Sequence, residues 1–484
     1  MNKKIQSFTL PLIASNLFQI IIAQVSLAII SRRSTEALAA IALIDGFLYA
    51  FAGILGAIGL AFNIYGAKAV GQSEETQLND YLSSVLFLVV AIGVSFFLIF
   101  LLFGRGILQV VYGFSGELLR TATLYLAIMS PYILLTLVTF VFTSLLKIEK
   151  KTNYILGVSI ISALVQVLLS YLLINCNLGF PAMGVLGSGI ANMLATLCLL
   201  GIYGVLLRES LARGLKQRPR KRAFLLKKSV PLMIQECFEG LVFIIAFEAF
   251  VSRLGVSTLA AYAIGSQGLM IARLPALMYG NAVTVFASEA NGQKNRQKIL
   301  AVGKSAFASS FVGYVGIASL IWDFRPAFFQ LFTTDVAVLD LLPAILPIML
   351  GIMLVSPLYE ITKYLLQSLE CSRTVCVLTG CVNSLVLMGI MGFWRSGQLN
   401  FFFLYCLYGM NFLILGGFFA GLFYWTIKQR DPQGKGTPLR VKKAKVLLSL
   451  RFFVAYNWTG GLIVADFFVK NGVAFCNQLG FPSL

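Results

Sequence analysis

The sequence contains no histidine among its 484 residues, which excludes imidazole bases, histidine haem ligands and histidine proton relays. Its eight cysteines form no C-x-x-C pair, so neither a zinc site nor a disulfide framework is indicated. No phosphate-binding P-loop is present. We therefore expect a protein that is not an enzyme, holds no cofactor and does not pump with ATP. Four cysteines lie inside strongly apolar segments, as small hydrophobic residues do: Cys198, Cys237, Cys376 and Cys406.

Charged residues are also scarce, at 12% of the chain against about 25% in soluble proteins. Hydrophobic residues make up 58%, and the mean hydropathy is +0.87. This composition predicts a polytopic membrane protein whose main partner is the lipid bilayer. The formal net charge of +19 arises from basic residues in short loops and tails, where they mark the cytoplasmic side. Charge therefore indicates topology, and no nucleic-acid partner is expected.

Twelve hydrophobic runs reach the roughly 18 residues that a spanning helix needs. The first begins at Phe8, is too long for a cleavable signal and lacks a small-residue cleavage site. The runs predict an all-α integral membrane fold with twelve transmembrane helices. They lie near residues 8–31, 38–63, 82–104, 121–146, 154–175, 184–207, 230–252, 258–287, 301–322, 338–369, 374–394 and 400–427.

The strongest topological signal is the connector at residues 208–228, which carries nine basic residues and the single acid Glu209. Such a loop is typical of the cytoplasmic side. With six spans on each side of it, both termini are expected in the cytoplasm of a multi-pass plasma-membrane protein. After residue 428 the tail is basic, and Arg451 and Asp466 leave too short an apolar run to cross a bilayer. We expect that tail to be cytoplasmic, with an interfacial segment.

Short motifs recur in the same order in the two halves of the chain. Pro11 begins a span, and Pro231 begins another 220 residues later. Residues 66–72 (GAKAVGQ) end a span, and residues 287–293 (ASEANGQ) end another with a shift of 221. Six spans per repeat return the chain to its starting side, which relates two lobes by a pseudo-two-fold axis along the membrane normal. The predicted parts are a lobe at 1–207, a linker at 208–228, a lobe at 229–427 and a tail at 428–484.

Two carboxylates follow Pro231 inside a predicted span, at Glu236 and Glu239. An ionised acid within a bilayer is costly unless it faces water, a partner or the bundle interior, so such residues are candidate functional groups. Because they are three residues apart, they share one face of a helix. The alternative is that one of them only hydrogen-bonds a neighbouring helix.

Residues 8–427 resemble the multidrug and toxic compound extrusion (MATE) family of the multidrug/oligosaccharidyl-lipid/polysaccharide flippase superfamily. These are secondary transporters that exchange organic cations and other amphiphiles for protons or sodium ions. No single motif is diagnostic, but their order and spacing are similar to those of the family. The motifs are Pro11, residues 34–40 (STEALAA), Gly66-Ala67 with Gly71, residues 179–191 (GFPAMGVLGSGIA), Pro231, Glu239, Leu254-Gly255 and residues 259–261 (LAA).

The resemblance assigns roles to two acids. In one branch of the family, an acid eight positions after the seventh-span proline helps to bind the coupling cation, and Glu239 lies eight positions after Pro231. This match favours Glu239 over Glu236. A second acid of that branch lies in the tenth span, where Glu360 is the nearest candidate.

The chain departs from the family in its first lobe. Members that couple through that lobe carry an aspartate in the first span, where this chain has Ser26 close to Gln24. Their fifth span carries an amide and an acid four residues apart, matched here by Gln166 and Ser170. Asp45 in the second span can stand in for the missing acid or be a solvated residue near a helix end.

These residues suggest a cation-coupled antiporter for small amphiphilic molecules, built as a monomer. A desolvated carboxylate binds a proton more readily, and a nearby cation opposes that, so H⁺ or Na⁺ and a cationic substrate can compete for one glutamate. Alternating exposure of Glu239 would couple the two fluxes.

Two basic residues inside predicted spans leave other interpretations open. Arg273 and Lys363 can pair with Glu239 or Glu360 as structural salt bridges, and Lys363 lies three residues after Glu360. They can also form a positive wall, which would suit a lipid-linked saccharide flippase or an exporter of anionic or peptidic metabolites. A receptor or scaffold remains a third class, although it requires no duplicated lobes.

Overall fold

A computed structural model describes residues 2–30, 35–175, 185–330, 332–333 and 335–429, without the side chains of residues 23–41 and 174–185. The described part is helical and contains no strand. Residues Met1–Lys428 form one compact unit. The second unit, Gln429–Leu484, lies outside the described residues apart from its first residue, and the predicted interfacial tail segment lies there too.

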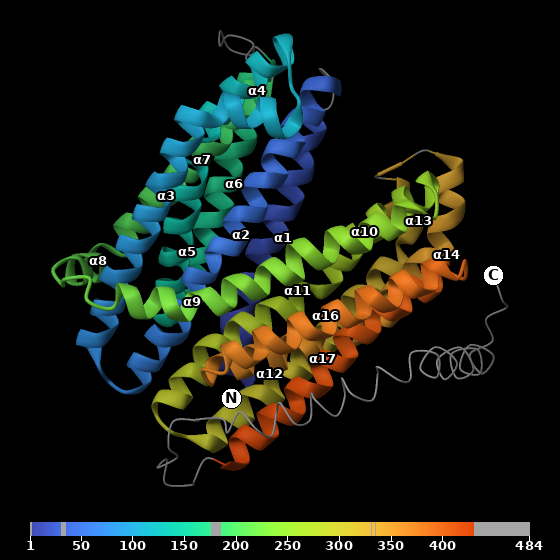
Figure 1. The fold of residues 1–484 in the computed structure, drawn as a ribbon. Helices are drawn as coiled ribbons and strands as arrows, with labels where there is room; N and C mark the ends of the chain where they lie inside the picture. The colour runs from blue at the N-terminus through green and yellow to red at the C-terminus, as the bar shows by residue number, and fades with distance from the viewer. Residues whose placement is uncertain (1, 31–34, 176–184, 331, 334, 430–484) are drawn as a thin grey trace. The chain divides into compact units, whose positions relative to one another are not determined.

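The helices of the first half run in blue to green in Figure 1. They are α1 (Asn2–Ile30), α2 (Thr35–Gly71), α3 (Glu75–Tyr112), α4 (Gly116–Met129), α5 (Tyr132–Ile148), α6 (Thr152–Asn175) and α7 (Val185–Leu206). The helices α4 and α5 together make one span, Gly116–Ile148.

The second half begins with the short helix α8 (Arg208–Leu215) in the basic connector. Its seventh span consists of α9 (Arg222–Glu236), the π-helical turn η1 (Cys237–Phe243) and α10 (Ile244–Ser252). The remaining elements are α11 (Val256–Gly292), α12 (Arg296–Asp323), α13 (Arg325–Gln330), α14 (Val336–Ile352), η2 (Met353–Val355), α15 (Ser356–Ser368), α16 (Ser372–Arg395) and α17 (Phe401–Gln429).

Twelve helical stretches in the described part are long and apolar enough to cross a membrane, which confirms the predicted twelve-helix fold. Their ends differ from the predicted ones. The helix of the seventh span begins at Arg222, inside the basic connector, and not near residue 230. Long basic side chains can place their charged ends in water while their stems cover apolar surface, so a helix can extend beyond its apolar core.

Prolines mark equivalent breaks in the two halves. Pro131 separates α4 from α5, and Pro357 opens α15 after the 3-10 turn η2. Proline lacks the amide hydrogen that an α-helix needs in its interior, so the helix is interrupted or bent at these points. Pro11 and Pro275 instead remain inside α1 and α11.

The turns after the helices repeat as well. Ser73 and Lys294 both have positive φ angles, of 60° and 55°, and they are 221 residues apart. Lys150 and Glu370, which are 220 residues apart, have φ angles of 60° and 67°. In the described residues these four are the non-glycine residues with positive φ. Because this conformation is uncommon outside glycine, its recurrence shows that the repeat extends to backbone geometry.

The backbones of the two halves come very close together where α2 and α11 end. A Cβ atom built on Gly71 would lie 2.1 Å from the backbone oxygen of Glu289, and one on Gly292 would lie 2.3 Å from the oxygen of Lys68. Only glycine allows backbones to come this near. The repeated GQ motif therefore marks a close backbone contact between the lobes.

Two ion pairs join the halves at this same end. Lys68 of α2 pairs with Glu370, and Lys150 Nζ lies 2.6 Å from Glu289 Oε2 of α11. Lys68 and Glu289 are equivalent positions in the repeats, as are Lys150 and Glu370. The pairs are thus related by the pseudo-symmetry with their charges exchanged, so that the first half supplies both lysines.

Candidate functional site

Glu239 lies on the irregular part of the seventh span. The helix α9 gives way at Cys237 to the π-helical turn η1, and the α-helix resumes at Ile244. Short π-helical turns inside α-helices are rare and frequently occur at functional sites. The carbonyl oxygen of Phe238 in this turn accepts a hydrogen bond from Asn383 Nδ2 of α16 at 3.4 Å. A side-chain amide thus supports the irregular backbone beside Glu239.

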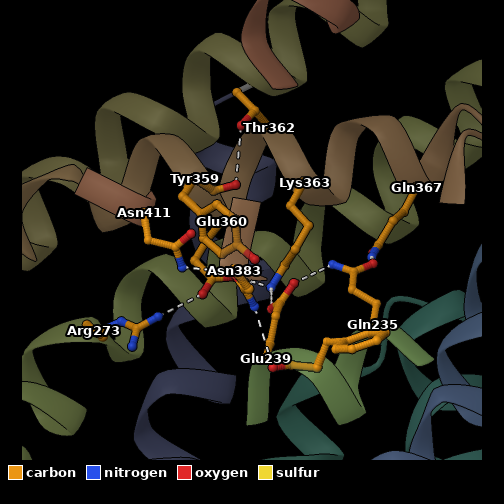
Figure 2. Close-up of polar contacts among 11 residues, drawn as sticks. Gln235, Glu239, Arg273, Tyr359, Glu360, Thr362, Lys363, Gln367, Asn383 and Asn411 are labelled. Carbon is orange, nitrogen blue, oxygen red and sulfur yellow. Dashed lines mark hydrogen bonds and ion pairs between the residues drawn. The ribbon is translucent and has the colours of Figure 1, made fainter. Parts of the chain in front are cut away.

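Glu239 is the first of four charged side chains that form a row (Figure 2). Lys363 Nζ of α15 lies 3.2 Å from Glu239 Oε2 and 2.9 Å from Glu360 Oε2. Arg273 Nη2 of α11 lies 3.0 Å from Glu360 Oε1. We call Glu239, Lys363, Glu360 and Arg273 the charge row. It contains two acids and two bases, so its formal charge is zero.

The four side chains of the charge row are mostly buried, but their exposed fractions differ. The side chains of Glu360 and Lys363 are 3% and 5% exposed, while those of Glu239 and Arg273 are 18% and 19% exposed. Buried charges are tolerated only when they are paired and hydrogen-bonded. Glu360 and Lys363 therefore form the buried centre of the row. Glu239 is the more exposed of its two acids.

Amide side chains complete the surroundings of Glu239. Gln235 Nε2, one turn earlier, donates to Glu239 Oε1 at 2.7 Å. Gln367 Nε2 of α15 donates to Gln235 Oε1 at 3.1 Å. Asn411 Nδ2 of α17 donates to Asn383 Oδ1 at 2.9 Å. Both oxygens of Glu239 are thus contacted, one by an amide and the other by an ammonium.

Aromatic rings line the cationic members of the row. The Arg273 guanidinium lies 5.1 Å from the centre of the Phe412 ring, and Lys363 Nζ lies 4.8 Å from the Tyr359 ring and 5.1 Å from the Tyr364 ring. Cation–π contacts of this kind stabilise a charge that has lost its water.

The structure brings together two of the predicted site residues and places a third nearby. Glu239 and Glu360 share Lys363, as the interpretation with salt bridges anticipated. The predicted pair of Glu360 and Lys363 at three-residue spacing is present. Glu236, at the end of α9, lies within electrostatic reach of Lys363, Glu239 and Glu360.

The first-half candidates lie elsewhere. Asp45 of α2 accepts hydrogen bonds from the Tyr125 hydroxyl at 2.9 and 3.1 Å. It is half-buried, and its partner comes from α4. Gln166 is half-buried on α6. The side chain of Gln24 falls outside the described residues.

Four amides of the site escaped the sequence analysis: Gln235, Gln367, Asn383 and Asn411. A signal for the first two existed, since Gln235 lies four residues before Glu239 and Gln367 four residues after Lys363. Residues at this spacing are neighbours on one helix face. An amide within an apolar span beside a charged residue is therefore worth including in a site prediction.

The fold and the charge row define a membrane transporter of two repeated lobes. The MatE family model matches residues 11–172 and 231–391, one match in each lobe and two thirds of the chain together. The chain therefore belongs to the MatE family. The two matched segments correspond to the two halves identified from the repeat.

Similar proteins have been described in bacteria. The chain is 24% identical over 338 residues to the "Probable multidrug resistance protein YoeA" of Bacillus subtilis, covering 68% of this chain and 73% of that one. It is 22% identical over 349 residues to the "Probable multidrug resistance protein NorM" of Thermotoga maritima, covering 70% and 74%.

Solved structures share the fold. A crystal structure of MATE in complex with MaD3S superposes with a TM-score of 0.79 at 16% identity, covering 88% of this chain and 97% of that one. The outward-facing conformation of a multidrug resistance MATE family transporter of the MOP superfamily gives 0.78 at 15% identity, covering 88% and 96%. A MOP superfamily transporter from Pyrococcus furiosus, whose structure is described as having reverse polarity of its binding pocket and a suggested different function, gives 0.78 at 16%, covering 88% and 96%.

Proposed function

We propose that this chain is a cation-coupled antiporter that exports organic cations or other amphiphilic compounds by alternating access between its two lobes. Glu239 is the carboxylate at which the coupling ion, H⁺ or Na⁺, and the substrate exclude each other. The chain acts as a monomer in the plasma membrane, with both termini in the cytoplasm. The names of the bacterial relatives support a multidrug substrate range.

The observation that carries this proposal is the position of Glu239, the more exposed of the two acids, at one end of the charge row. Its Oε2 is bound by Lys363, which also has Glu360 as a partner at 2.9 Å. A cation that arrives at Glu239 can therefore displace the ammonium without leaving it unpaired. Release of that cation lets Lys363 return, which restores neutrality at the site. During such an exchange Lys363 always keeps a carboxylate partner, so its buried charge is never left unpaired.

The test is an ion-gradient flux assay in proteoliposomes with a panel of fluorescent organic cations. Glu239→Gln keeps the size of the side chain and removes its charge, and we expect gradient-driven flux to fall at least about tenfold because a single ionic contact to a charged group contributes 1.5–3 kcal/mol. Glu248→Gln is the matched control, since Glu248 lies in the same span but is exposed. Equal transport by Glu239→Gln and wild type would exclude Glu239 as the exchange site.

A second candidate function is the export of an anionic compound or the flipping of a lipid-linked saccharide. The presence of both Arg273 and Lys363 in the charge row favours it, because two cations with aromatic neighbours also suit an anionic head group. The same assay distinguishes the two functions when the panel includes anionic amphiphiles. Flux of the anions that is lost in Arg273→Gln and retained in Glu239→Gln would select the second function.

A further inference from the structure

The buried position between the two carboxylates of the charge row is filled by the protein's own ammonium group. Lys363 Nζ lies 3.2 Å from Glu239 Oε2 and 2.9 Å from Glu360 Oε2 (Figure 2). Hard metal cations bind oxygen ligands, and here oxygens from two acids surround one point. We propose that Lys363 is a resident counter-ion that takes the place of a metal cation at this point, so that Na⁺ is not a coupling ion of this protein.

Lys363 Nζ donates a hydrogen bond to Glu239 Oε2 at 3.2 Å, but its contact with Glu360 is that of a counter-ion more than of a directional donor. Glu360 Oε2 is within 2.9 Å of the ammonium, yet it is among the buried oxygens that have no hydrogen bond of good direction. The contact therefore acts through charge, as a bound ion does. The side chain of Lys363 is 5% exposed, and its Nζ lies 4.8 Å from the centre of the Tyr359 ring and 5.1 Å from that of Tyr364, which limits the other partners the ammonium can reach.

A tethered cation competes strongly with a dissolved one. Lys363 is carried on α15 three residues after Glu360, so its local concentration is fixed by the helix and does not depend on the salt outside. A Na⁺ ion bound between the two carboxylates would have to expel the ammonium from both of them, which would leave it a buried unpaired charge. Arg273 adds a second resident positive charge on the other oxygen of Glu360 and opposes entry of a further cation.

This inference rests on the proposed antiport and narrows it to the proton among the two coupling ions. The titratable groups around Lys363 are Glu236, Glu239, Glu360, Tyr359 and Tyr364, and the fixed cation beside them is Arg273. A proton can neutralise a carboxylate without occupying the position of the ammonium. A metal ion cannot.

The experiment measures thermal unfolding of the purified full-length protein in detergent, in NaCl and in choline chloride of equal ionic strength. Wild type is expected to unfold at the same temperature in both salts. Lys363→Met removes the ammonium at similar side-chain length, and we expect NaCl to raise its Tm by about 3 °C or more over choline chloride, as binding to the native state alone does. Lys363→Gln serves as a second variant if the first does not give a monodisperse protein.

The matched control is Arg273→Met, which changes the charge of the row by the same amount but leaves Lys363 between the carboxylates. We expect no Na⁺-specific shift in this variant. A Na⁺-specific shift in wild type, or none in a folded Lys363 variant, would overturn the proposal. The measurement needs no transport, so it can succeed or fail separately from the proposed antiport.

Discussion

Asn63 and Thr284 occupy the same position in the two repeats, 221 residues apart, and Asn63 Nδ2 donates a hydrogen bond to Thr284 Oγ1 at 3.2 Å. Both residues are buried, at 2% and 0% exposure. A contact between equivalent residues occurs where a pseudo-two-fold axis passes between them. The helices α2 and α11 therefore lie on either side of this axis, and the features at their ends recur in symmetric pairs.

Alanine at the crossing glycines should weaken the contact between the lobes. Gly71→Ala and Gly292→Ala each place a methyl group within 2.1–2.3 Å of a backbone oxygen of the other lobe. Overpacking of this kind lowers the free energy of unfolding by about 1–3 kcal/mol, and a backbone oxygen cannot rotate away from the new methyl group as a side chain can. Thermal unfolding in detergent is expected to show a lower Tm for both variants. Gly53→Ala in α2, where nothing lies within 4 Å, should be unaffected and is the control.

The two symmetric ion pairs should hold the lobes together additively. Neutralising one acid, as in Glu289→Gln or Glu370→Gln, is expected to cost about 0.2–1 kcal/mol, because these pairs are partly exposed. The double variant should increase hydrogen–deuterium exchange at residues 66–72 and 287–293 more than either single variant. Glu117→Gln is the control, because Glu117 is an exposed acid in the first turn of α4. Unchanged exchange in the double variant would show that the pairs do not hold the lobes.

The two acids of the charge row should differ in their effect on stability. Glu360 is 3% exposed and contacts both Arg273 and Lys363, whereas Glu239 is 18% exposed. Removing one partner from a buried pair costs about 3–5 kcal/mol, so we expect Glu360→Gln to lower the Tm clearly more than Glu239→Gln does. A Tm for Glu360→Gln equal to that of wild type would argue that water reaches Glu360.

The first lobe should contribute little to ion coupling. Asp45 accepts hydrogen bonds from the Tyr125 hydroxyl. Unlike the acids of the charge row, it has no basic side chain among the contacts described for it. We expect Asp45→Asn to keep gradient-driven flux within about threefold of wild type, which corresponds to less than 1 kcal/mol. Tyr125→Phe separates the effect of the hydrogen bond from that of the charge. A loss for Asp45→Asn as large as that for Glu239→Gln would make coupling a property of both lobes.

The apolar runs predicted the helical architecture because membrane helices must satisfy their backbone hydrogen bonds internally and must be long enough to cross. Twelve apolar runs therefore became twelve candidate spans. The proline at 231 and the acid eight residues later also singled out a helix that proves to be irregular. Composition could not predict the π-helical turn at Cys237–Phe243, since its residues are ordinary for an apolar helix.

The sequence by itself determined the helical membrane fold, the duplication and the short set of intramembrane charges, because each depends on local composition and spacing. Only the tertiary structure decided how those charges combine. Lys363 is 124 residues from Glu239, and Arg273 is 87 residues from Glu360, so the pairs form through packing of separate helices. Burial then forces them to neutralise one another, and this is why the charge row carries two acids, two bases and no net charge.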